Sequence, residues 1–353
     1  MSITPLSYVD VEVTNSCNFR CSYCYEKGHY QSDMLSVVDF KAVIDRLSKY
    51  VDLGSLHLVL WGGEPLLNYW LMEYIFKSGL VENLKKLLIL TNGSLIEYYI
   101  DLFKQYKHKV WIQISYDGEP IHSKNRFDIY GKPTTDIVLE AIDLLYHNNI
   151  EFSLKPTLPI DNLQYMFDAY KDYVKLHNQY KDVNLMYNPT LDHYSKDISD
   201  EALKVLYQQL VEIVRFSVKE GYTILSWLLE DKKPLCSAGV SMFSIDIDGD
   251  VYPCHGCFYH NSTDHKWGNI FSLTNEDLDR FRYNYYQAFN KARIEDQQCN
   301  YSFCRRCNVT AFKFSDKHSY FDKWIDFKSQ PLICKTSKVI HIAKQAYKAL
   351  MRG

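Results

Sequence analysis

Three cysteines, Cys17, Cys21 and Cys24, lie within eight residues near the start of the chain. They follow an alternating apolar stretch, residues 8–13, that predicts a short strand. Cubane iron–sulfur clusters normally take four thiolates, so a C-x3-C-x2-C loop leaves one iron open to a ligand that is not protein. We expect that open iron to be the active centre. Zinc is the alternative, but structural zinc takes four ligands, usually from two C-x2-C pairs, and no fourth ligand lies close by.

The spacing of the cysteines, with the aromatic Tyr23 just before the last of them, resembles the radical S-adenosylmethionine (SAM) enzymes. In that family the amino and carboxylate groups of S-adenosylmethionine chelate the open iron of a 4Fe–4S cluster. One electron from the cluster then cleaves the sulfonium to a 5′-deoxyadenosyl radical, which abstracts hydrogen from the substrate. The resemblance implies these cofactors and an electron donor such as flavodoxin or ferredoxin.

Strand patterns alternate with helical patterns after the cysteine loop, which predicts a parallel sheet. Six such units between residue 7 and about 195 are too few to close an eight-stranded barrel, so we expect an α/β fold built on a partial (β/α)6 barrel. Ligands collect at the carboxyl ends of such strands, so the loops there should carry the chemistry. After the first strand, the expected strands are Leu56–Trp61, Leu87–Thr91, Val110–Tyr116, Phe152–Leu158 and Val183–Tyr187, and the expected helices are near 36–50, 66–85, 95–107, 134–149 and 161–180.

The second strand runs into Gly62, Gly63 and Glu64, followed by a proline. Two glycines allow close backbone approach and unusual φ values. The run resembles the family motif that hydrogen-bonds the methionyl amine of S-adenosylmethionine. A plain strand-to-helix turn, with Glu64 at a helix N-terminus and Pro65 at the first helical position, is the alternative.

Polar side chains also follow the third and fourth strands. From the resemblance, Asn92 and Ser115 look like ribose and carboxylate binders, Arg126 would pair with the methionyl carboxylate through two hydrogen bonds, and Tyr23 would contact the adenine. Simple turns are the alternative, since the dipeptides Asn92-Gly93 and Asp117-Gly118 favour positive φ whatever their function.

Composition sets limits on the rest. The 353-residue chain has 46% hydrophobic and 24% charged residues, which supports one barrel-sized domain and a smaller one. A formal net charge of -3 gives no electrostatic case for a nucleic-acid or membrane partner. No run of eighteen apolar residues exists and the first twenty residues lack signal-peptide order, so we expect a cytoplasmic protein.

Seven further cysteines all follow residue 235, and their short spacings favour metal ligation over disulfides. An Asp248-Gly249 turn between apolar runs predicts a β-hairpin beside the first of them. We therefore expect a barrel over residues 1–195, a helical linker over 196–229 and a cluster-binding module over 230–353. The seven are Cys236, Cys254, Cys257, Cys299, Cys304, Cys307 and Cys334.

The order of Cys236, Gly249 and Cys254 resembles the SPASM extension, an auxiliary-cluster domain related to Twitch domains, although the later spacings depart from its pattern. Seven thiolates cannot close two four-ligand clusters. The options are two auxiliary clusters with one open iron, one closed cluster with spare cysteines, or a further ligand such as His255. Zinc in a knuckle of two C-x2-C pairs, ending at Cys307, is the alternative.

Enzymes with this C-terminal resemblance act mainly on ribosomally made peptides, so we expect a peptide-modifying maturase. The alternatives are an anaerobic sulfatase-maturing (formylglycine-generating) enzyme, a small-molecule radical SAM enzyme, and a non-catalytic iron–sulfur or zinc protein. In the sulfatase-maturing group an aspartate follows the cysteine of the Tyr-Pro-Cys run, where His255 stands here. Because the first strand starts by about residue 7, we expect leader recognition to come from a separate protein or from the barrel and SPASM surfaces.

Overall fold

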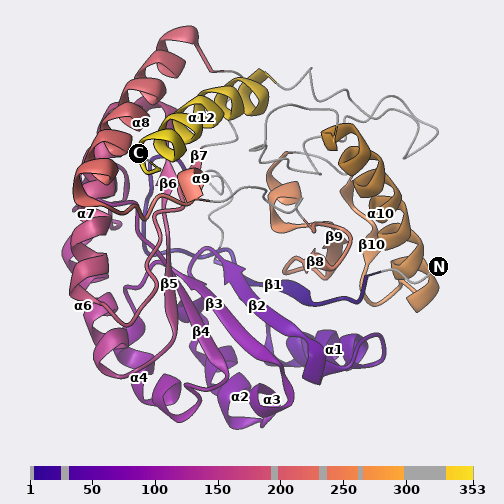
Figure 1. Cartoon of the computed structure of the whole chain (residues 1–353). Coiled ribbons are helices and arrows are strands. Elements are labelled where there is room, and N and C mark those ends of the chain that lie inside the picture. Colours follow the sequence, from indigo (N-terminus) through magenta and orange to yellow (C-terminus); the bar gives the residue numbers. More distant parts are fainter. Residues whose placement is uncertain are drawn as a thin grey trace.

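The structure is a computed structural model that describes residues 4–24, 32–191, 198–229, 237–260, 265–297 and 331–352. Five consecutive strands pair in parallel in its main sheet (Figure 1). Each pairs with the next along the chain, so their carboxyl ends meet at one edge. The strands are β1 (Tyr8–Thr14), β2 (His57–Gly62), β3 (Lys86–Thr91), β4 (Val110–Ser115) and β5 (Phe152–Lys155).

Helices connect these strands and lie on the outer side of the sheet (Figure 1). Among the described residues, no helix combines the length and the apolar character that crossing a bilayer would require. In chain order the helices are α1 (Val37–Ser48), η1 (Leu53–Ser55), η2 (Pro65–Leu67), α2 (Tyr69–Lys77), α3 (Leu80–Asn83), α4 (Ile96–Gln105), α5 (Ile121–Asn125), α6 (Thr135–His147), η3 (Ile160–Tyr165) and α7 (Met166–Gln179).

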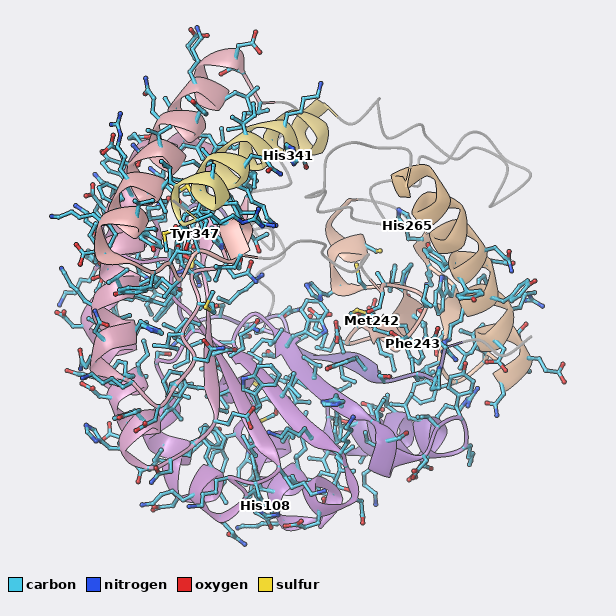
Figure 2. The ribbon with its side chains drawn as sticks, viewed as in Figure 1. His108, Met242, Phe243, His265, His341 and Tyr347 are labelled. Carbon is cyan, nitrogen blue, oxygen red and sulfur yellow. The ribbon has the colours of Figure 1, made fainter. Side chains whose placement is uncertain are left out.

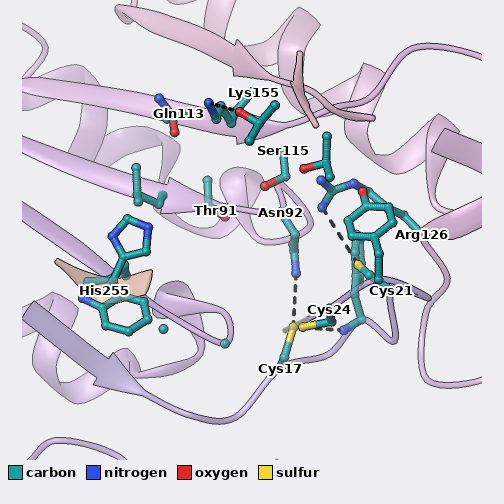
Figure 3. A pocket seen from close by; sticks show the side chains of 18 of the residues that line it. Cys17, Cys21, Cys24, Thr91, Asn92, Gln113, Ser115, Arg126, Lys155 and His255 are labelled. Carbon is teal, nitrogen blue, oxygen red and sulfur yellow. Dashed lines mark hydrogen bonds between the residues drawn. The ribbon is translucent and has the colours of Figure 1, made fainter. Parts of the chain in front are cut away.

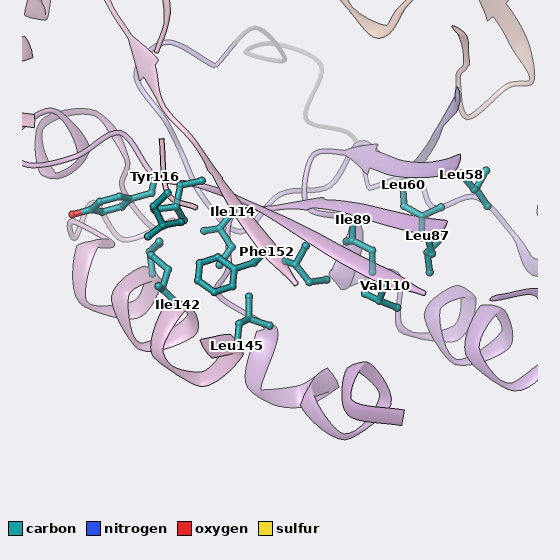
Figure 4. Close-up of a cluster of buried hydrophobic side chains, with 14 of the residues drawn as sticks. Leu58, Leu60, Leu87, Ile89, Val110, Ile114, Tyr116, Ile142, Leu145 and Phe152 are labelled. Carbon is teal, nitrogen blue, oxygen red and sulfur yellow. The ribbon is translucent and has the colours of Figure 1, made fainter. Parts of the chain in front are cut away.

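Strand β4 explains how the sheet serves both a core and a cavity. Its side chains alternate between buried apolar residues, such as Ile112 and Ile114, and half-buried polar ones, Gln113 and Ser115. The apolar side chains pack toward the outer helices, where Figure 4 draws Ile114 near Ile142 of α6. A strand between two apolar layers would be apolar throughout, so the alternation marks an inner face that is not a packed core.

The C-terminal half adds strands to the same sheet. β8 pairs with β1 in parallel and with β9 in an antiparallel hairpin, and the sheet order is β10-β9-β8-β1-β2-β3-β4-β5. The predicted hairpin with an Asp248-Gly249 turn is confirmed, whereas the junction with β1 had no sequence signal. The elements after α7 are β7 (Thr190–Leu191), α8 (Asp200–Glu220), α9 (Ser226–Leu229), β8 (Met242–Ile245), β9 (Asp250–Tyr252), η4 (His255–His260), β10 (Gly268–Asn269), α10 (Asn275–Gln297) and α12 (Pro331–Leu350).

Two long helices hold this half in place. On α10, the ring of Phe281 stacks on Trp267 at 5.4 Å, and Arg282 donates to the carbonyl oxygen of Val240 at 2.9 Å. Helix α12 packs against α8 and α9. Figure 2 accordingly shows Tyr347 beside α8, on the opposite side of the molecule from Phe243.

The sixth predicted strand is wrong. Residues 183–187 form no strand, although Leu185 and Tyr187 are buried in alternation, because the backbone of Tyr187 bonds to Ile224 and Ser226 instead of to a sheet. The fifth predicted strand is divided at Pro156, which has no N–H for the ladder. The short β6 (Thr157–Leu158) that follows pairs with β7 in a separate two-stranded sheet.

Two predicted helices are divided as well. The helix expected over 66–85 is broken into α2 and α3 at Gly79, whose φ of +79° is left-handed. The helix expected over 161–180 begins as the 3-10 turn η3 before it continues as α7. The other helices expected in the barrel half are confirmed to within a few residues at each end, and α8 lies in the segment where a helical linker was expected.

The substitution Ile112→Ala tests the core assignment. Ile112 is fully buried, so truncation should lower the free energy of unfolding of the apoprotein by about 2–5 kcal/mol, through lost burial and the cavity left behind. Ile137→Ala, at an α6 position that is 40% exposed, is the matched control and should cost much less. Equal shifts in the urea midpoint of the two variants would contradict the assignment.

Candidate active site

A cavity of about 540 Å³ opens at the carboxyl edge of the parallel strands (Figure 3). This volume lies in the range of small-molecule and cofactor sites. Residues from the loops after β1 to β4 line it, together with residues of β5 and β7 and one histidine of η4. The residues predicted from the sequence that line it are Cys17, Cys21, Cys24, Tyr23, Gly62, Gly63, Asn92, Ser115 and Arg126.

The end of β2 holds the start of the cysteine loop. The amide of Gly63 donates to the carbonyl oxygen of Thr14 at 2.9 Å, and that of Glu64 donates to the carbonyl oxygen of Ser16 at 2.8 Å. A Cβ on Gly62, whose φ is +134°, would lie 2.0 Å from the Thr14 oxygen, and one on Gly63 would lie 2.3 Å from the Ser16 oxygen. The close approach expected of the two glycines is therefore an approach to the backbone of the cysteine loop.

Glu64 is fully buried and is not among the residues that line the cavity. Its carboxylate accepts from the hydroxyl of Thr91 at 2.7 Å and from the amides of Asn92 at 2.7 Å and Leu66 at 3.1 Å. Burial raises its pKa to about 7 even though these donors oppose the shift. It caps η2, with Pro65 at the first position, as the turn alternative predicted. Its predicted bond to the methionyl amine stays a prediction.

Asn92 joins the end of β3 to the middle of the cysteine loop. Its amide nitrogen donates to the side-chain oxygen of Asn18 at 2.9 Å and lies 4.0 Å from the sulfur of Cys17. Its own oxygen accepts from the amide of Ser94 at 2.9 Å, and Asn18 donates in turn to the hydroxyl of Ser94. This closed set of bonds orients Asn92 where it borders the cavity.

The far end of the cysteine loop is held beside β4 and α5. The amide of Arg20 donates to Phe127 at 2.6 Å, and the amide of Ser22 donates to Asn125 at 2.8 Å. Arg126 does not present both prongs to the cavity, because its Nε and Nη2 atoms pair with Asp117 at 2.8 and 3.0 Å. Burial alone would raise the pKa of Asp117, but the positive charge and hydrogen bonds of Arg126 outweigh it and lower that pKa.

Burial raises the pKa of Cys17 to about 12 and that of Cys21 to about 11. Thiols of this kind stay protonated at neutral pH unless a cationic partner stabilises the thiolate, which metal ions do. In the part of the chain that the structure describes, no three His, Cys, Asp or Glu side chains group closely enough to hold a single ion. Three thiols around one cavity suit a multinuclear centre, whose metals are ligated separately.

The inner face of the barrel is polar near these thiols. Gln113 and Ser115 of β4 and Lys155 of β5 line the cavity, and the ammonium group of Lys155 lies 2.6 Å from the hydroxyl of Thr190. Asn188, which precedes β7, accepts from the hydroxyl of Ser226 at 2.9 Å and is not among the lining residues.

His255 reaches the same cavity from the C-terminal half. Its Nδ1 atom lies 3.1 Å from the carboxylate of Asp10, which is buried in β1, and its ring lies 5.3 Å from that of Trp61. The flanking Cys254 and Cys257 bring their sulfur atoms to 3.9 Å. The predicted ligands Cys236, Cys299, Cys304 and Cys307 lie outside the described residues, and so does the side chain of Cys334.

Sequence reasoning missed the residues that support this site. Asp117 was considered only as part of a turn, although a carboxylate nine residues before an arginine was a usable signal. Asn18 lies inside the cysteine run, and Asp10 lies in an apolar strand, where a buried carboxylate needs a partner. The partners of Asn18 and Asp10 lie far away in the sequence.

Two family models match the chain: the radical SAM superfamily over residues 11–173, and the SPASM iron–sulfur cluster-binding domain over residues 236–308. The chain belongs to the radical SAM superfamily. It is a radical SAM enzyme with an α/β fold, a parallel-dominated sheet and a C-terminal SPASM domain, as predicted. S-adenosylmethionine and 4Fe–4S clusters are the cofactors of this class, which favours clusters over the zinc alternatives.

Several known radical SAM proteins resemble most of the chain. The cysteine-type anaerobic sulfatase-maturating enzyme of Clostridium perfringens is 25% identical over 341 residues, covering 86% of this chain and 90% of that protein. The radical SAM cyclopropyl synthase TigE of Paramaledivibacter caminithermalis is 23% identical over 70% of this chain and 57% of its own length. The chain is thus similar, over most of its length, to proteins that include a maturating enzyme and a radical SAM cyclopropyl synthase.

Solved structures give the same fold. The structure of anSMEcpe with bound AdoMet has a TM-score of 0.72 at 21% identity and covers 99% of both chains. Streptococcus suis SuiB bound to its precursor peptide SuiA has a TM-score of 0.57 at 14% identity, covering 79% of this chain and 65% of that one. The arrangement of barrel and C-terminal half is thus shared with these proteins.

Gly63→Ala should displace the cysteine loop, because its Cβ would lie 2.3 Å from the oxygen of Ser16. We expect the variant to retain less iron per chain after anaerobic reconstitution, approaching the loss caused by Cys24→Ala. Gly54→Ala is the control, since the nearest atom to its Cβ would lie at 3.5 Å. Wild-type iron content in the Gly63 variant would refute the role given to this close approach.

Glu64→Gln tests the buried carboxylate. The folded state holds the proton up to about pH 7 whereas the unfolded chain loses it near pH 4.5, so ionisation of Glu64 destabilises the wild type as pH rises between these values. The stability of wild type relative to Glu64→Gln should therefore fall by about 3 kcal/mol from pH 5 to pH 8 in denaturation of the apoprotein. Glu97→Gln, at an exposed position of α4, is the matched control. A flat or rising difference for Glu64 would contradict the raised pKa.

Proposed function

We propose that this radical SAM enzyme is a maturase that abstracts a hydrogen atom from a residue of a ribosomally synthesised peptide, leading to a crosslink or a related modification. The observation that carries the proposal is that three half-buried thiols, polar strand ends and a histidine of the C-terminal half border one cavity. The cavity thus has room for a cofactor beside the thiols. A residue of the C-terminal half also lines it, where a bound peptide would make contact.

In this proposal each lining residue has a separate task. Cys17, Cys21 and Cys24 would each bind one iron and leave the fourth without a protein ligand. When bound, the cluster and S-adenosylmethionine supply the 5′-deoxyadenosyl radical that removes hydrogen. The residues expected to lie along the cofactor are Tyr23, Gly62, Gly63, Asn92, Ser115 and Arg126. Glu64 would act mainly through the backbone that it fixes, because its carboxylate is already bonded to Thr91, Asn92 and Leu66.

The C-terminal residues would receive the peptide. His255 lines the cavity with its Nδ1 atom engaged by Asp10, which fixes the ring and leaves Nε2 as its other polar atom. Cys254 and Cys257 would belong to one or two auxiliary iron–sulfur clusters completed by the remaining cysteines, with residues 230–353 as the cluster-binding unit and 196–229 as the linker. Binding next to an auxiliary cluster would hold the peptide within reach of the barrel.

Sulfatase maturation is the second candidate, because a cysteine-type anaerobic sulfatase-maturating enzyme aligns with 86% of this chain. The structure of anSMEcpe with bound AdoMet and Cp18Cys peptide has the same fold, which also favours a peptide substrate. The substitution of His255 for the aspartate that the sulfatase-maturing group carries after its Tyr-Pro-Cys run argues for a different reaction. An electron donor such as flavodoxin or ferredoxin, a separate leader-binding protein and a cytoplasmic location complete the proposal.

The test is an anaerobic assay of the reconstituted full chain with S-adenosylmethionine and a reductant. Candidate substrates are a peptide encoded beside the gene and a sulfatase-type peptide with its target cysteine. We expect 5′-deoxyadenosine, and loss of a hydrogen pair from the first peptide by mass spectrometry. Cys24→Ala should abolish both products, because two thiolates cannot hold the cubane.

Other outcomes would change the assignment. Conversion of the target cysteine to formylglycine would favour sulfatase maturation. Formation of 5′-deoxyadenosine with neither peptide changed would favour a small-molecule substrate. A chain that binds zinc alone and shows no iron–sulfur absorbance would refute the radical mechanism.

A further inference from the structure

Asp117, after β4, is a buried carboxylate shared by three segments of the chain. Its side chain is fully buried. Oδ1 accepts from the amide of Thr157 at 2.8 Å and from Nη2 of Arg126 at 3.0 Å, while Oδ2 accepts from Nε of Arg126 at 2.8 Å and from the hydroxyl of Tyr23. Four donors occupy the acceptor positions of one carboxylate, so its orientation is fixed.

The same bonds fix the orientation of Arg126. Arg126 is 7% exposed, and the Nε and Nη2 atoms of its guanidinium donate to Asp117. Its remaining nitrogen, Nη1, lies 3.9 Å from the sulfur of Cys21 (Figure 3). Its central carbon lies 5.4 Å from the ring of Tyr23, within the range of a cation–π contact. Because the guanidinium is planar and two of its nitrogens are bound to Asp117, the direction of the third nitrogen, toward Cys21, is fixed.

We propose that Asp117 is a positioning residue that, through Arg126, holds a cationic N–H donor at the sulfur of Cys21 and thereby sets the reduction potential of the iron–sulfur cluster. The inference rests on the proposed function, since it needs a cluster on the three cysteines. Hydrogen bonds to cluster sulfurs and nearby net charge are known determinants of such potentials. A positive donor stabilises the reduced, more negative cluster, so Arg126 should make the cluster easier to reduce.

A purely structural turn would not require this arrangement. A turn needs the backbone of Asp117 and Gly118, whereas here the carboxylate reaches the cysteine loop through Tyr23 and the second sheet through Thr157. A role for Arg126 restricted to a cofactor carboxylate would favour a fork open to the cavity. Instead its bidentate edge is closed by Asp117 and its free nitrogen faces a thiol.

The experiment is a redox titration of the anaerobically reconstituted full chain, followed by electron paramagnetic resonance. The signal that changes when S-adenosylmethionine is added identifies the barrel cluster and separates it from auxiliary clusters. Arg126→Gln removes the charge and the guanidinium donor at Cys21, so the cluster should become harder to reduce. The reduction equilibrium should shift by roughly tenfold, which makes the midpoint potential of the cluster about 59 mV more negative for a one-electron couple. Arg126→Lys, which keeps the charge without the fork, should lie between wild type and Arg126→Gln.

Asp117→Asn tests whether Asp117 acts through Arg126. If it does, Asp117→Asn should change the midpoint potential of the cluster in the wild-type background and leave it unchanged in the Arg126→Gln background. Equal changes in both backgrounds would overturn the positioning role. Asp172→Asn is the matched control, because Asp172 accepts from Tyr116 and Glu119 at 2.6 and 3.2 Å and belongs to α7, and it should leave the potential unchanged.

Failure of the inference and failure of the proposed function give different results. A wild-type chain without a cluster that responds to S-adenosylmethionine would refute the proposed function. A wild-type cluster that responds, with an unchanged potential in Arg126→Gln, would refute this inference alone. If Asp117→Asn does not fold, the comparison of Arg126→Gln with Arg126→Lys still decides whether the donor at Cys21 sets the potential.

Discussion

The position of the cysteine loop depends on hydrogen bonds from the ends of three neighbouring parallel strands. The loop after β2 bonds to its first residues, Asn92 after β3 bonds to its middle, and the segment after β4 bonds to its end. Parallel pairing makes this possible because it brings all three loops to one edge. The three thiols then border one cavity.

Two buried carboxylates support this loop with opposite electrostatics. Glu64 is surrounded by neutral donors, and burial raises its pKa. Asp117 is equally buried but has Arg126 beside it, and its pKa is lowered. The Asp117–Arg126 ion pair therefore keeps both of its charges at the edge of the cavity. Glu64 instead orients the hydrogen-bond donors around it, and burial disfavours its charged form.

Local patterns in the sequence predicted much of this molecule. Cysteine spacing, strand–helix alternation and the Asp-Gly hairpin each depend on residues close together in the chain, so they were readable. The pairing of Arg126 with Asp117 was missed, because the eight residues between them had to fold back before the guanidinium met the carboxylate. The pairing of β8 with β1 was also hidden, since Ser244 and Asp10, which share a hydrogen bond, are 234 residues apart. The strand pattern at 183–187 misled because burial can alternate along a segment that pairs with no sheet.

The addition of β8 to β1 has a consequence for how the barrel can exist. β1 has β2 on one side and β8 on the other, so both of its backbone edges are satisfied. A barrel cut away after α7 would expose the amides and carbonyls of Tyr8–Val11 as an open template for self-association. It would also strip Asp10 of its bonds to Ser244 and His255. The C-terminal half thus protects the edge of β1 and prevents self-association of the N-terminal half through that strand.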